Sequence, residues 1–277
     1  MFVQVEASAR RLPDLWRLKA VTWCFTAIQA WYRYSTQFLT TVQDDTDRLQ
    51  HKVEALSKDL QSAHPNQLFP CMSADLSSRD QTRSLVEQVF KNSTVASKHS
   101  AISILVANAG LGKRIRDVKD IEEENWDEMM EVNARSQFVL TRSCLPGMRV
   151  QSWGRVILVG SIASKGGGIN GCHYAATKGA LSSMGQNLAT VLAGEGVTVN
   201  AATMIGATDM IPTPKSTTWT SDTNLEALKV SDPGLAIAAS IPVHRLGQPY
   251  EVANVAVMMA KTGYLTGQEI VLSGGLK

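Results

Sequence analysis

Tyr174 and Lys178, four residues apart, form the most chemically informative pair in this sequence. On a helix this spacing puts both side chains on one face, one turn apart. A phenol has an ordinary pKa of about 10, so it exchanges protons poorly near neutral pH. A neighbouring ammonium group favours the phenolate and lowers that pKa. The pair therefore predicts a group that can pass a proton to a substrate.

Ser161 lies directly after an apolar stretch that is typical of a buried strand, thirteen residues before Tyr174. Its hydroxyl can donate a hydrogen bond to the substrate oxygen that Tyr174 protonates. A Tyr-x-x-x-Lys spacing is common by chance, so the interpretation depends on further signals. Asn133 inside a long helical pattern, and Asn108-Ala109-Gly110 after an earlier apolar run, supply them. Together these residues predict acid–base chemistry on a developing alkoxide.

The elements that must position these residues alternate along the chain. Apolar residues at steps of three and four predict helices over 44–60, Arg79–Lys91, 121–145, 175–192 and 250–260, and we expect Pro146-Gly147 to end the third of these. Continuous apolar runs predict buried strands over Ala101–Ala107, 155–159, 197–200 and Glu269–Leu272. This alternation predicts one α/β domain with a doubly wound parallel sheet and helices on both faces. Loops at the carboxyl ends of its strands, including the proline-interrupted stretch 207–245, should line the site.

Composition excludes several classes of protein. The 277 residues are 44% hydrophobic and 19% charged, enough to bury a sizeable core. A net charge of +2 provides no basic field for nucleic acid. The cysteines are far apart in the sequence, at Cys24, Cys71, Cys144 and Cys172, which predicts neither a disulfide scaffold nor a metal site. We therefore expect a protein of a reducing compartment, the cytoplasm, without a nucleic-acid partner.

The first 43 residues differ from the rest. All twenty glycines lie at or after Gly110. Basic residues precede an apolar run of 13 residues over 20–32, which is shorter than the roughly 20 residues of a membrane span. This segment is open to three interpretations: a packed strand or helix, an organelle-targeting or anchoring sequence, or a start wrongly joined to the chain. We predict an atypical segment over 1–43 and the main domain over 44–277, without a membrane span.

The chain resembles the classical short-chain dehydrogenases/reductases, and 3-oxoacyl-acyl-carrier-protein reductases in particular. The resemblance runs from about residue 44 to 277 and rests on motifs in a specific order and spacing. These motifs are Asp75 in ADLS, Asn108-Ala109-Gly110, Asn133 in NWDEMMEVNA, Ser161, Tyr174 with Lys178, RLGQPYEVA over 245–253 and TGQEIVLSGG over 266–275. The resemblance implies a Rossmann-like fold and hydride transfer between a nicotinamide cofactor and a carbonyl carbon.

The resemblance also implies a role for each matching residue. Tyr174 would donate the proton, and Lys178 would lower its pKa and bind the nicotinamide ribose. Ser161 would orient the substrate carbonyl. Asn133 would hold a water in a proton relay through Lys178. The remaining cofactor contacts would come from Asp75 against the adenine, from Asn108 and Gly110, and from the backbone of Ile205 at the carboxamide.

Two departures from the family pattern concern the cofactor. The family has a glycine-rich turn after its first strand, where the backbone approaches the pyrophosphate at a helix N-terminus. No glycine precedes Gly110 here, so we expect the first βαβ unit to be incomplete or replaced. The family also has Pro-Gly in a loop after 197–200, whereas this chain reads AATMIG over 201–206. Around residues 19–22 and 38–42 only faint strand signals remain.

These observations predict an NAD(P)(H)-dependent oxidoreductase that reduces a ketone to a secondary alcohol. Asp44 after 38–42 hints at NAD, but reductive family members often use NADPH, so NADP(H) is preferred over NAD(H). The resemblance implies a homodimer or homotetramer that pairs through the long helices, 121–145 and 173–193. The alternative is an inactive relative or defective gene product with a binding role, motivated by the missing glycines. His173 is interpreted as structural, with pocket lining as its alternative.

Overall fold

A five-stranded sheet forms the centre of the computed structural model, which describes residues 2–6, 46–65, 68–72, 74–166, 170–206, 211, 214 and 224–276. The strands lie side by side in the order β1 (Phe2–Glu6), β2 (Ala101–Ala107), β3 (Gly154–Val159), β4 (Val197–Met204) and β5 (Glu269–Leu272). The pairings of β2 with β3, β3 with β4 and β4 with β5 are parallel. The predicted α/β fold with a parallel sheet is confirmed for these four strands.

Helices connect the strands and cover the sheet. The long ones are α2 (Thr46–Ala63), α3 (Arg79–Lys91), α6 (Ser136–Val150), α7 (Cys172–Leu192) and α10 (Pro249–Lys261). The shorter ones are α4 (Ser93–Lys98), α5 (Glu123–Met130), α8 (Leu225–Ser231), α9 (Pro233–Ser240) and the single turns η2 (Val118–Asp120), η3 (Glu131–Arg135), η4 (Ile162–Lys165) and η5 (Ala193–Glu195). Within the described ranges, no helix is long and apolar enough to cross a membrane.

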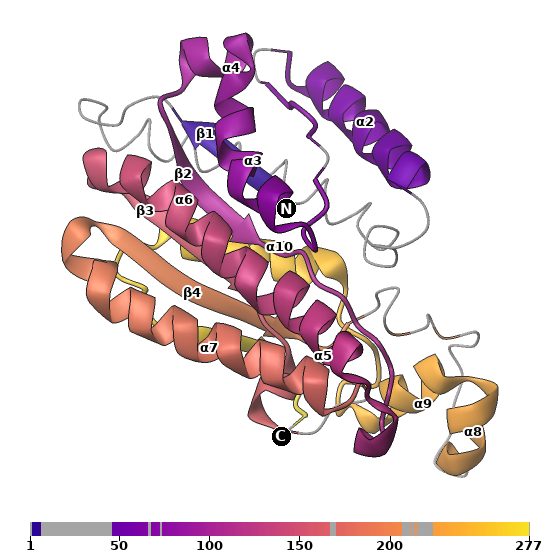
Figure 1. Cartoon of the computed structure of the whole chain (residues 1–277). Coiled ribbons are helices and arrows are strands. Elements are labelled where there is room, and N and C mark those ends of the chain that lie inside the picture. The colour runs from indigo at the N-terminus through magenta and orange to yellow at the C-terminus, as the bar shows by residue number, and fades with distance from the viewer. Residues whose placement is uncertain are drawn as a thin grey trace.

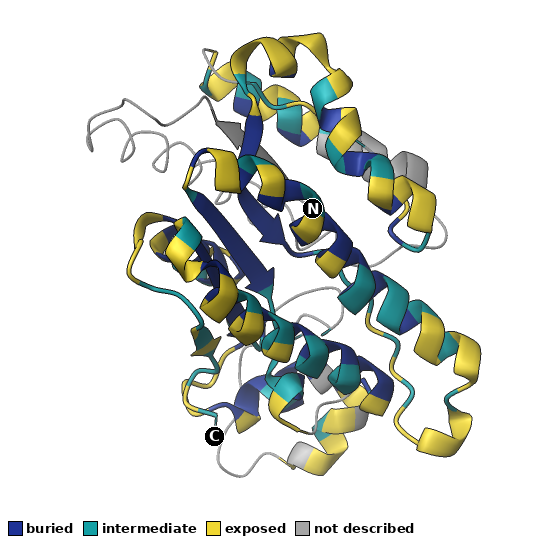
Figure 2. Ribbon diagram, turned by 60° about the vertical axis from the view of Figure 1, so that its left-hand side comes forward, coloured by how far each residue is buried: buried dark blue, intermediate teal, exposed yellow. Residues whose placement is uncertain are grey.

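Both faces of the sheet are covered, as a doubly wound fold requires. On one face, Leu56 of α2 and Val252 of α10 pack against Ile104 and Ile157 of the sheet. On the other face, α3, α6 and α7 lie over the sheet (Figure 1), and their side chains pack against β2, β3 and β4. Strands β2, β3 and β4 are almost entirely buried, β5 is only partly buried, and the outward sides of the helices are exposed (Figure 2). Because β3 and β4 are parallel, their carboxyl ends meet at one edge of the sheet. Helix α7 covers one face there and α10 covers the other.

Strand β1 is an element that the sequence analysis did not foresee. It runs antiparallel to β2, with Phe2 opposite Val106 and Glu6 opposite Ala101. Its sequence, FVQVE, alternates apolar and polar residues, which suits an edge strand better than a strand buried on both faces. The strand signals at 19–22 and 38–42 lie outside the described residues, as does the predicted boundary at 43/44, which stays a prediction.

Two predicted boundaries were wrong. The helix expected to stop at Pro146 continues to Val150, because Met148 is fully buried beyond the proline and Gly147 packs against Ala101 of β2. The strand expected over 197–200 continues to Met204. Ala202 pairs there with Val159 on one side and Ile270 on the other. In both cases burial of the continuing chain outweighs the local sequence signal.

Candidate active site

Ser161, Tyr174 and Lys178 meet at the carboxyl end of β3. Ser161 is the N-cap of the η4 turn, and its Oγ accepts a hydrogen bond from the amide of Ala163 at 3.2 Å. Helix α7 brings Tyr174 and Lys178 to the same place. The Lys178 Nζ donates a hydrogen bond to the carbonyl of Val159, the last residue of β3, at 2.9 Å. The spacing of the tyrosine and lysine thus has the predicted consequence of placing both on one buried face of a helix.

The start of α7 is fixed by a glycine. Gly171, its N-cap, has a φ of 87°, and a Cβ there would lie 1.9 Å from the carbonyl oxygen of Ile115. Only glycine adopts this conformation without cost and leaves room for the carbonyl. The loop after β2 can therefore cross close to the helix turn that carries Tyr174.

Asn133 joins three parts of the site. It is fully buried in η3, a π-helical stretch between α5 and α6, and such stretches occur often at functional sites. Its Oδ1 accepts a hydrogen bond from the amide of Leu111 at 2.6 Å, and its Nδ2 donates to the carbonyl of the same residue at 2.9 Å. The Nδ2 also lies 3.2 Å from the hydroxyl of Thr177 on α7. Asn133 thereby ties the loop after β2 to the helix of Tyr174 and Lys178.

Burial dominates the electrostatics of this site. It raises the pKa of Tyr174, and a hydrogen bond with Ser161 opposes that rise. Burial also lowers the pKa of Lys178 to about 8. The expected lowering of the Tyr174 pKa by Lys178 is not found. The ammonium nitrogen lies 5.8 Å from the centre of the phenol ring and is hydrogen-bonded to Val159, so desolvation of the phenolate outweighs its charge.

The residues beside Lys178 fit the nicotinamide half of a dinucleotide. A Cβ on Gly110 would lie 3.5 Å from the Lys178 Nζ and 3.2 Å from the Asn133 Oδ1, so this glycine lies directly beside both side chains. Asn108 is buried directly after β2 and precedes this glycine. A buried amine and a side-chain amide beside a glycine are suitable donors for ribose hydroxyls and a carboxamide.

Two predicted cofactor residues lie apart from this cluster. Asp75 is exposed before α3, and its Oδ1 accepts hydrogen bonds from the amide and hydroxyl of Ser77 at 2.9 and 2.7 Å. Ile205 follows β4, and its amide donates to Leu272 at 3.3 Å while its carbonyl accepts from Gly247 at 3.2 Å. The backbone of Ile205, which was expected to contact the carboxamide, therefore already makes hydrogen bonds within the protein.

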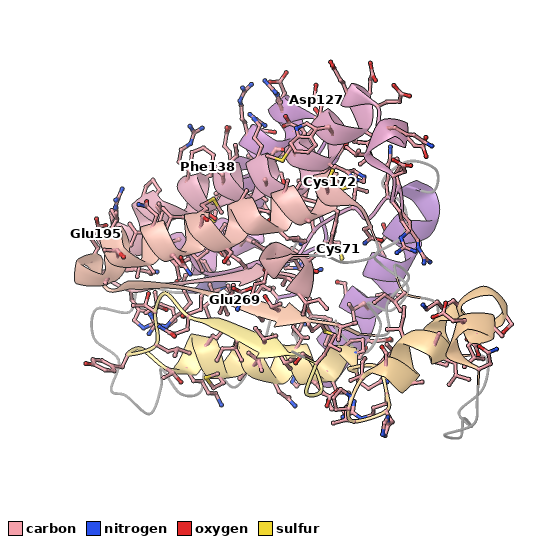
Figure 3. The ribbon with its side chains drawn as sticks, turned by 90° about the horizontal axis from the view of Figure 1, so that it is seen from below. Cys71, Asp127, Phe138, Cys172, Glu195 and Glu269 are labelled. Carbon is pink, nitrogen blue, oxygen red and sulfur yellow. The ribbon has the colours of Figure 1, made fainter. Side chains whose placement is uncertain are left out.

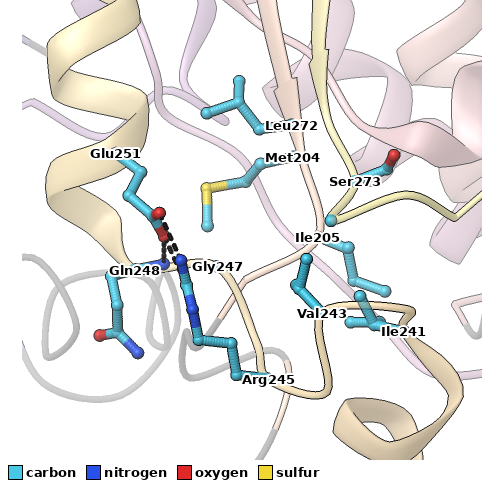
Figure 4. Close-up of a pocket in the computed structure, with 11 residues that line it drawn as sticks. Met204, Ile205, Ile241, Val243, Arg245, Gly247, Gln248, Glu251, Leu272 and Ser273 are labelled. Carbon is cyan, nitrogen blue, oxygen red and sulfur yellow. Dashed lines mark hydrogen bonds and ion pairs between the residues drawn. The ribbon is translucent and has the colours of Figure 1, made fainter.

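Ile205 lines a separate pocket at the carboxyl ends of β4 and β5 (Figure 4). Arg245 and Glu251 pair across one side of it, with Nη2 and Oε1 2.7 Å apart. Its remaining lining is mostly apolar and comes from Met204, Ile241, Val243, Gly247, Gln248, Leu272, Ser273 and Gly274. Neither Tyr174 nor Lys178 lines this pocket.

One residue of the site, Thr177, was missed by sequence reasoning. Thr177 donates a hydrogen bond to the carbonyl of Tyr174 at 2.8 Å and contacts Asn133. Its position three residues after Tyr174 was a readable signal.

His173 is fully buried, and no described residue hydrogen-bonds its ring nitrogens. Its pKa is lowered by burial and by the charge of Lys113. Its burial agrees with the structural interpretation but leaves its polar atoms unexplained.

Comparisons with known proteins match most of the chain. A sequence profile described as enoyl-(acyl carrier protein) reductase matches residues 36–277. The chain is 32% identical over 204 residues to a 3-oxoacyl-(acyl-carrier-protein) reductase of Thermotoga maritima, which covers 73% of this chain and 74% of that protein. It is 30% identical over 187 residues to an acetoacetyl-CoA reductase of Cupriavidus necator, which covers 66% of this chain and 69% of that protein.

Solved structures share the fold. A 3-oxoacyl-(acyl-carrier-protein) reductase of Brucella melitensis has a TM-score of 0.66 and 26% identity, with 82% of this chain and 78% of that chain covered. A proposed NAD(P)-dependent gluconate 5-dehydrogenase of Beutenbergia cavernae, crystallised with NADP at low occupancy, has the same TM-score and identity. The match covers 81% of this chain and 82% of the dehydrogenase chain.

Proposed function

The chain belongs to the short-chain dehydrogenase/reductase family of NAD(P)-dependent oxidoreductases, and we propose that it reduces the ketone of a 3-oxoacyl-like substrate to a secondary alcohol. The observation that carries this proposal is the convergence of Ser161, Tyr174 and Lys178 at the end of β3, tied to Asn133. The relatives named as 3-oxoacyl-(acyl-carrier-protein) reductase and acetoacetyl-CoA reductase support the substrate class.

The reaction follows from the protonation states of the site. Tyr174 is held as the neutral phenol by burial, so it can donate a proton, and Ser161 can donate a second hydrogen bond to the same oxygen. A nicotinamide cofactor held beside Lys178 would supply the hydride for the carbonyl carbon. As negative charge develops on the substrate oxygen, Tyr174 transfers its proton to it. The phenolate that remains would be stabilised by the hydrogen bond with Ser161 and would regain its proton through Lys178 and a water held near Asn133.

NADP(H) is the cofactor that we propose in preference to NAD(H). Lys178 would bind the nicotinamide ribose, and Asn108 and Gly110 would lie against the same half of the cofactor. Asp75 would contact the adenine through its second carboxylate oxygen. The reductive relatives and the neighbour with bound NADP support this choice. Comparing the dissociation constants of NADPH and NADH tests it directly.

The test of the reaction is the oxidation of NADPH by acetoacetyl-CoA, followed by absorbance. Tyr174→Phe removes only the phenolic oxygen and should lower kcat by about 100- to 10,000-fold while the affinity for NADPH stays unchanged. Tyr264→Phe is the matched control, because Tyr264 is fully exposed, and this variant should retain the wild-type rate. A Tyr174→Phe enzyme as fast as the wild type would refute the proposed mechanism.

A second candidate is a non-catalytic relative that binds a partner or metabolite. It is favoured by the absence of glycine before Gly110 and by the antiparallel strand β1 beside β2. It predicts a folded protein that binds neither NADPH nor NADH. The intact set of Asn133, Ser161, Tyr174 and Lys178 favours the enzyme, because those side chains have no evident use without a cofactor.

We also propose a homodimer or homotetramer in the cytoplasm, paired through α5, α6 and α7. These helices carry exposed apolar side chains, Trp126, Phe138, Val150 and Val191. Figure 3 shows Phe138 pointing outward from the helix layer. Pairing of two copies would remove this surface from water. Gel filtration that finds only a monomer would contradict this assembly.

A further inference from the structure

A buried carboxylate on the last strand binds side chains from three other elements. The side chain of Glu269 on β5 is 10% exposed. Its Oε1 accepts hydrogen bonds from the hydroxyls of Thr203 at 2.8 Å and Ser164 at 3.2 Å, and its Oε2 accepts from the hydroxyl of Ser182 at 3.3 Å. The Lys165 Nζ lies 3.5 Å from Oε2. Figure 3 shows Glu269 beneath α7.

The donors belong to the elements that carry the proposed catalytic side chains. Ser164 lies in η4, the turn that Ser161 caps, and its amide donates to the carbonyl of Ser161 at 3.0 Å. Ser182 lies on α7 about one turn after Lys178, on the same face. One carboxylate therefore connects the turn of Ser161 to the helix of Tyr174.

Thr203 adds a contact with the backbone next to Ser161. A Cβ on Gly160 would lie 2.3 Å from the Thr203 Oγ1, so the threonine hydroxyl packs directly against the bare glycine. The amide of Gly160 also donates to the carbonyl of Ala202 at 2.9 Å. The chain segment that leads into Ser161 is thus held against β4, in part by the same threonine that donates a hydrogen bond to Glu269.

The ionised state of Glu269 determines how the three hydroxyl groups are oriented. Burial alone would raise its pKa, but the hydrogen bond from Thr203, the charge of Lys165 and the hydroxyls of Ser164 and Ser182 lower the pKa overall. An ionised carboxylate only accepts hydrogen bonds, so all three hydroxyls must point toward it. Charged acceptors also form stronger hydrogen bonds than neutral ones, which restricts the positions of η4 and α7.

We propose that Glu269 is a positioning residue that holds Ser161 in register with Tyr174 and Lys178. The inference rests on the proposed reductase function, because it assigns Glu269 to the alignment of that site. Glu269 itself does not contact the substrate. It acts through Thr203, Ser164 and Ser182.

The test compares two substitutions of Glu269 in the full-length protein. Glu269→Val removes every polar contact and should lower kcat about 10- to 100-fold through misplacement of Ser161. Its KM for NADPH should stay within about twofold of the wild type, since the cofactor contacts are unchanged. Glu269→Gln keeps an oxygen acceptor and should recover part of the lost kcat. The matched control is Glu195→Gln, at the opposite end of α7 from Cys172, which should retain the wild-type kcat (Figure 3).

A second readout does not depend on activity. Hydrogen exchange at residues 160–166 should be faster in Glu269→Val than in Glu195→Gln. If the valine variant does not fold, the double variant Ser164→Ala/Ser182→Ala replaces it with the same expectations. Unchanged kcat together with unchanged exchange would overturn the proposal, as would a fall in stability alone with full kcat in the folded protein. A wild-type protein without reductase activity would refute the proposed function, while the exchange measurement would still decide whether Glu269 holds η4.

Discussion

The carboxyl ends of β3 and β4 and the outer edge of β2 are built differently. At β3 and β4, hydrogen bonds link Asn133 of η3 to Thr177 of α7, Thr177 to the carbonyl of Tyr174, and Lys178 to the carbonyl of Val159. At the outer edge of β2, the neighbouring strand β1 is antiparallel, so its amino end lies beside the carboxyl end of β2. A strand in that direction cannot deliver a turn and a helix N-terminus to the cofactor edge.

The difference separates two tasks of a nicotinamide-dependent reductase. In the proposed mechanism, proton transfer and binding of the nicotinamide half use only residues from β2 onward. Binding of the diphosphate through a glycine turn needs a parallel strand followed by a helix, which β1 does not provide. The comparison predicts that the first task depends on the hydrogen-bonded cluster and not on β1.

The largest effect should come from Lys178→Met. Loss of the ammonium should lower kcat about 100- to 10,000-fold. The same change should increase the free energy of unfolding at pH 7 by about 1–3 kcal/mol, because a buried cation whose pKa is lowered to about 8 disfavours folding. The measurements are the NADPH oxidation rate and urea unfolding.

The pH dependence of stability gives the sign of this effect. Between pH 8 and the ordinary lysine pKa of 10.5, the unfolded wild type binds more protons than the folded state, so its stability relative to the variant rises with pH. The advantage of Lys178→Met should therefore be complete below pH 8 and vanish toward pH 10.5. The control is Lys119→Met, which removes an exposed ion pair with Asp117 and should change neither kcat nor the free energy of unfolding. A less stable Lys178→Met protein at pH 7 would contradict the account.

Asn133→Ala should have the next largest effect. It leaves the amide and carbonyl of Leu111 without their side-chain partner, which should cost about 1–3 kcal/mol in unfolding free energy. Displacement of the loop after β2 should lower kcat by about 10- to 100-fold. The exposed residue Asn187 on α7 provides the control, and Asn187→Ala should behave as the wild type. Equal behaviour of the two variants would argue against the bridging role of Asn133.

Removal of β1 tests whether cofactor binding depends on this strand. Deleting residues 1–6 exposes the edge of β2 and should lower the unfolding free energy by about 1–3 kcal/mol through the lost backbone pairing. The dissociation constant of NADPH should change less than about threefold, since β1 offers no glycine turn to the cofactor. A loss of NADPH binding in a folded deletion protein would show that β1 contributes to the cofactor site.

The smallest effect concerns thiol reactivity. Burial raises the pKa of Cys144 to about 12, so this thiol should resist alkylation in the native protein. Cys71 and Cys172 are exposed and should be modified, as mass spectrometry of the alkylated protein would show. Rapid modification of Cys144 would indicate that α6 opens away from β2.

The parallel sheet and the central site were predictable because each depends on local patterns. Ala101–Ala107 is a continuous apolar run, and Tyr174 and Lys178 share a helix face by spacing alone. The extension of the helix past Pro146 was not predictable, because it depends on burial of Met148. The hydrogen bonds of Glu269 were also missed, although a glutamate at the start of an apolar strand was a readable signal. Its partners come from three elements that only the fold brings together.

Titration of the purified protein with NADPH and NADH, followed by fluorescence, tests the central claim most directly. The account predicts saturable binding in the micromolar range, tighter for NADPH, and unchanged by Tyr174→Phe. Binding of neither nucleotide by the folded protein would contradict it and would favour the non-catalytic relative.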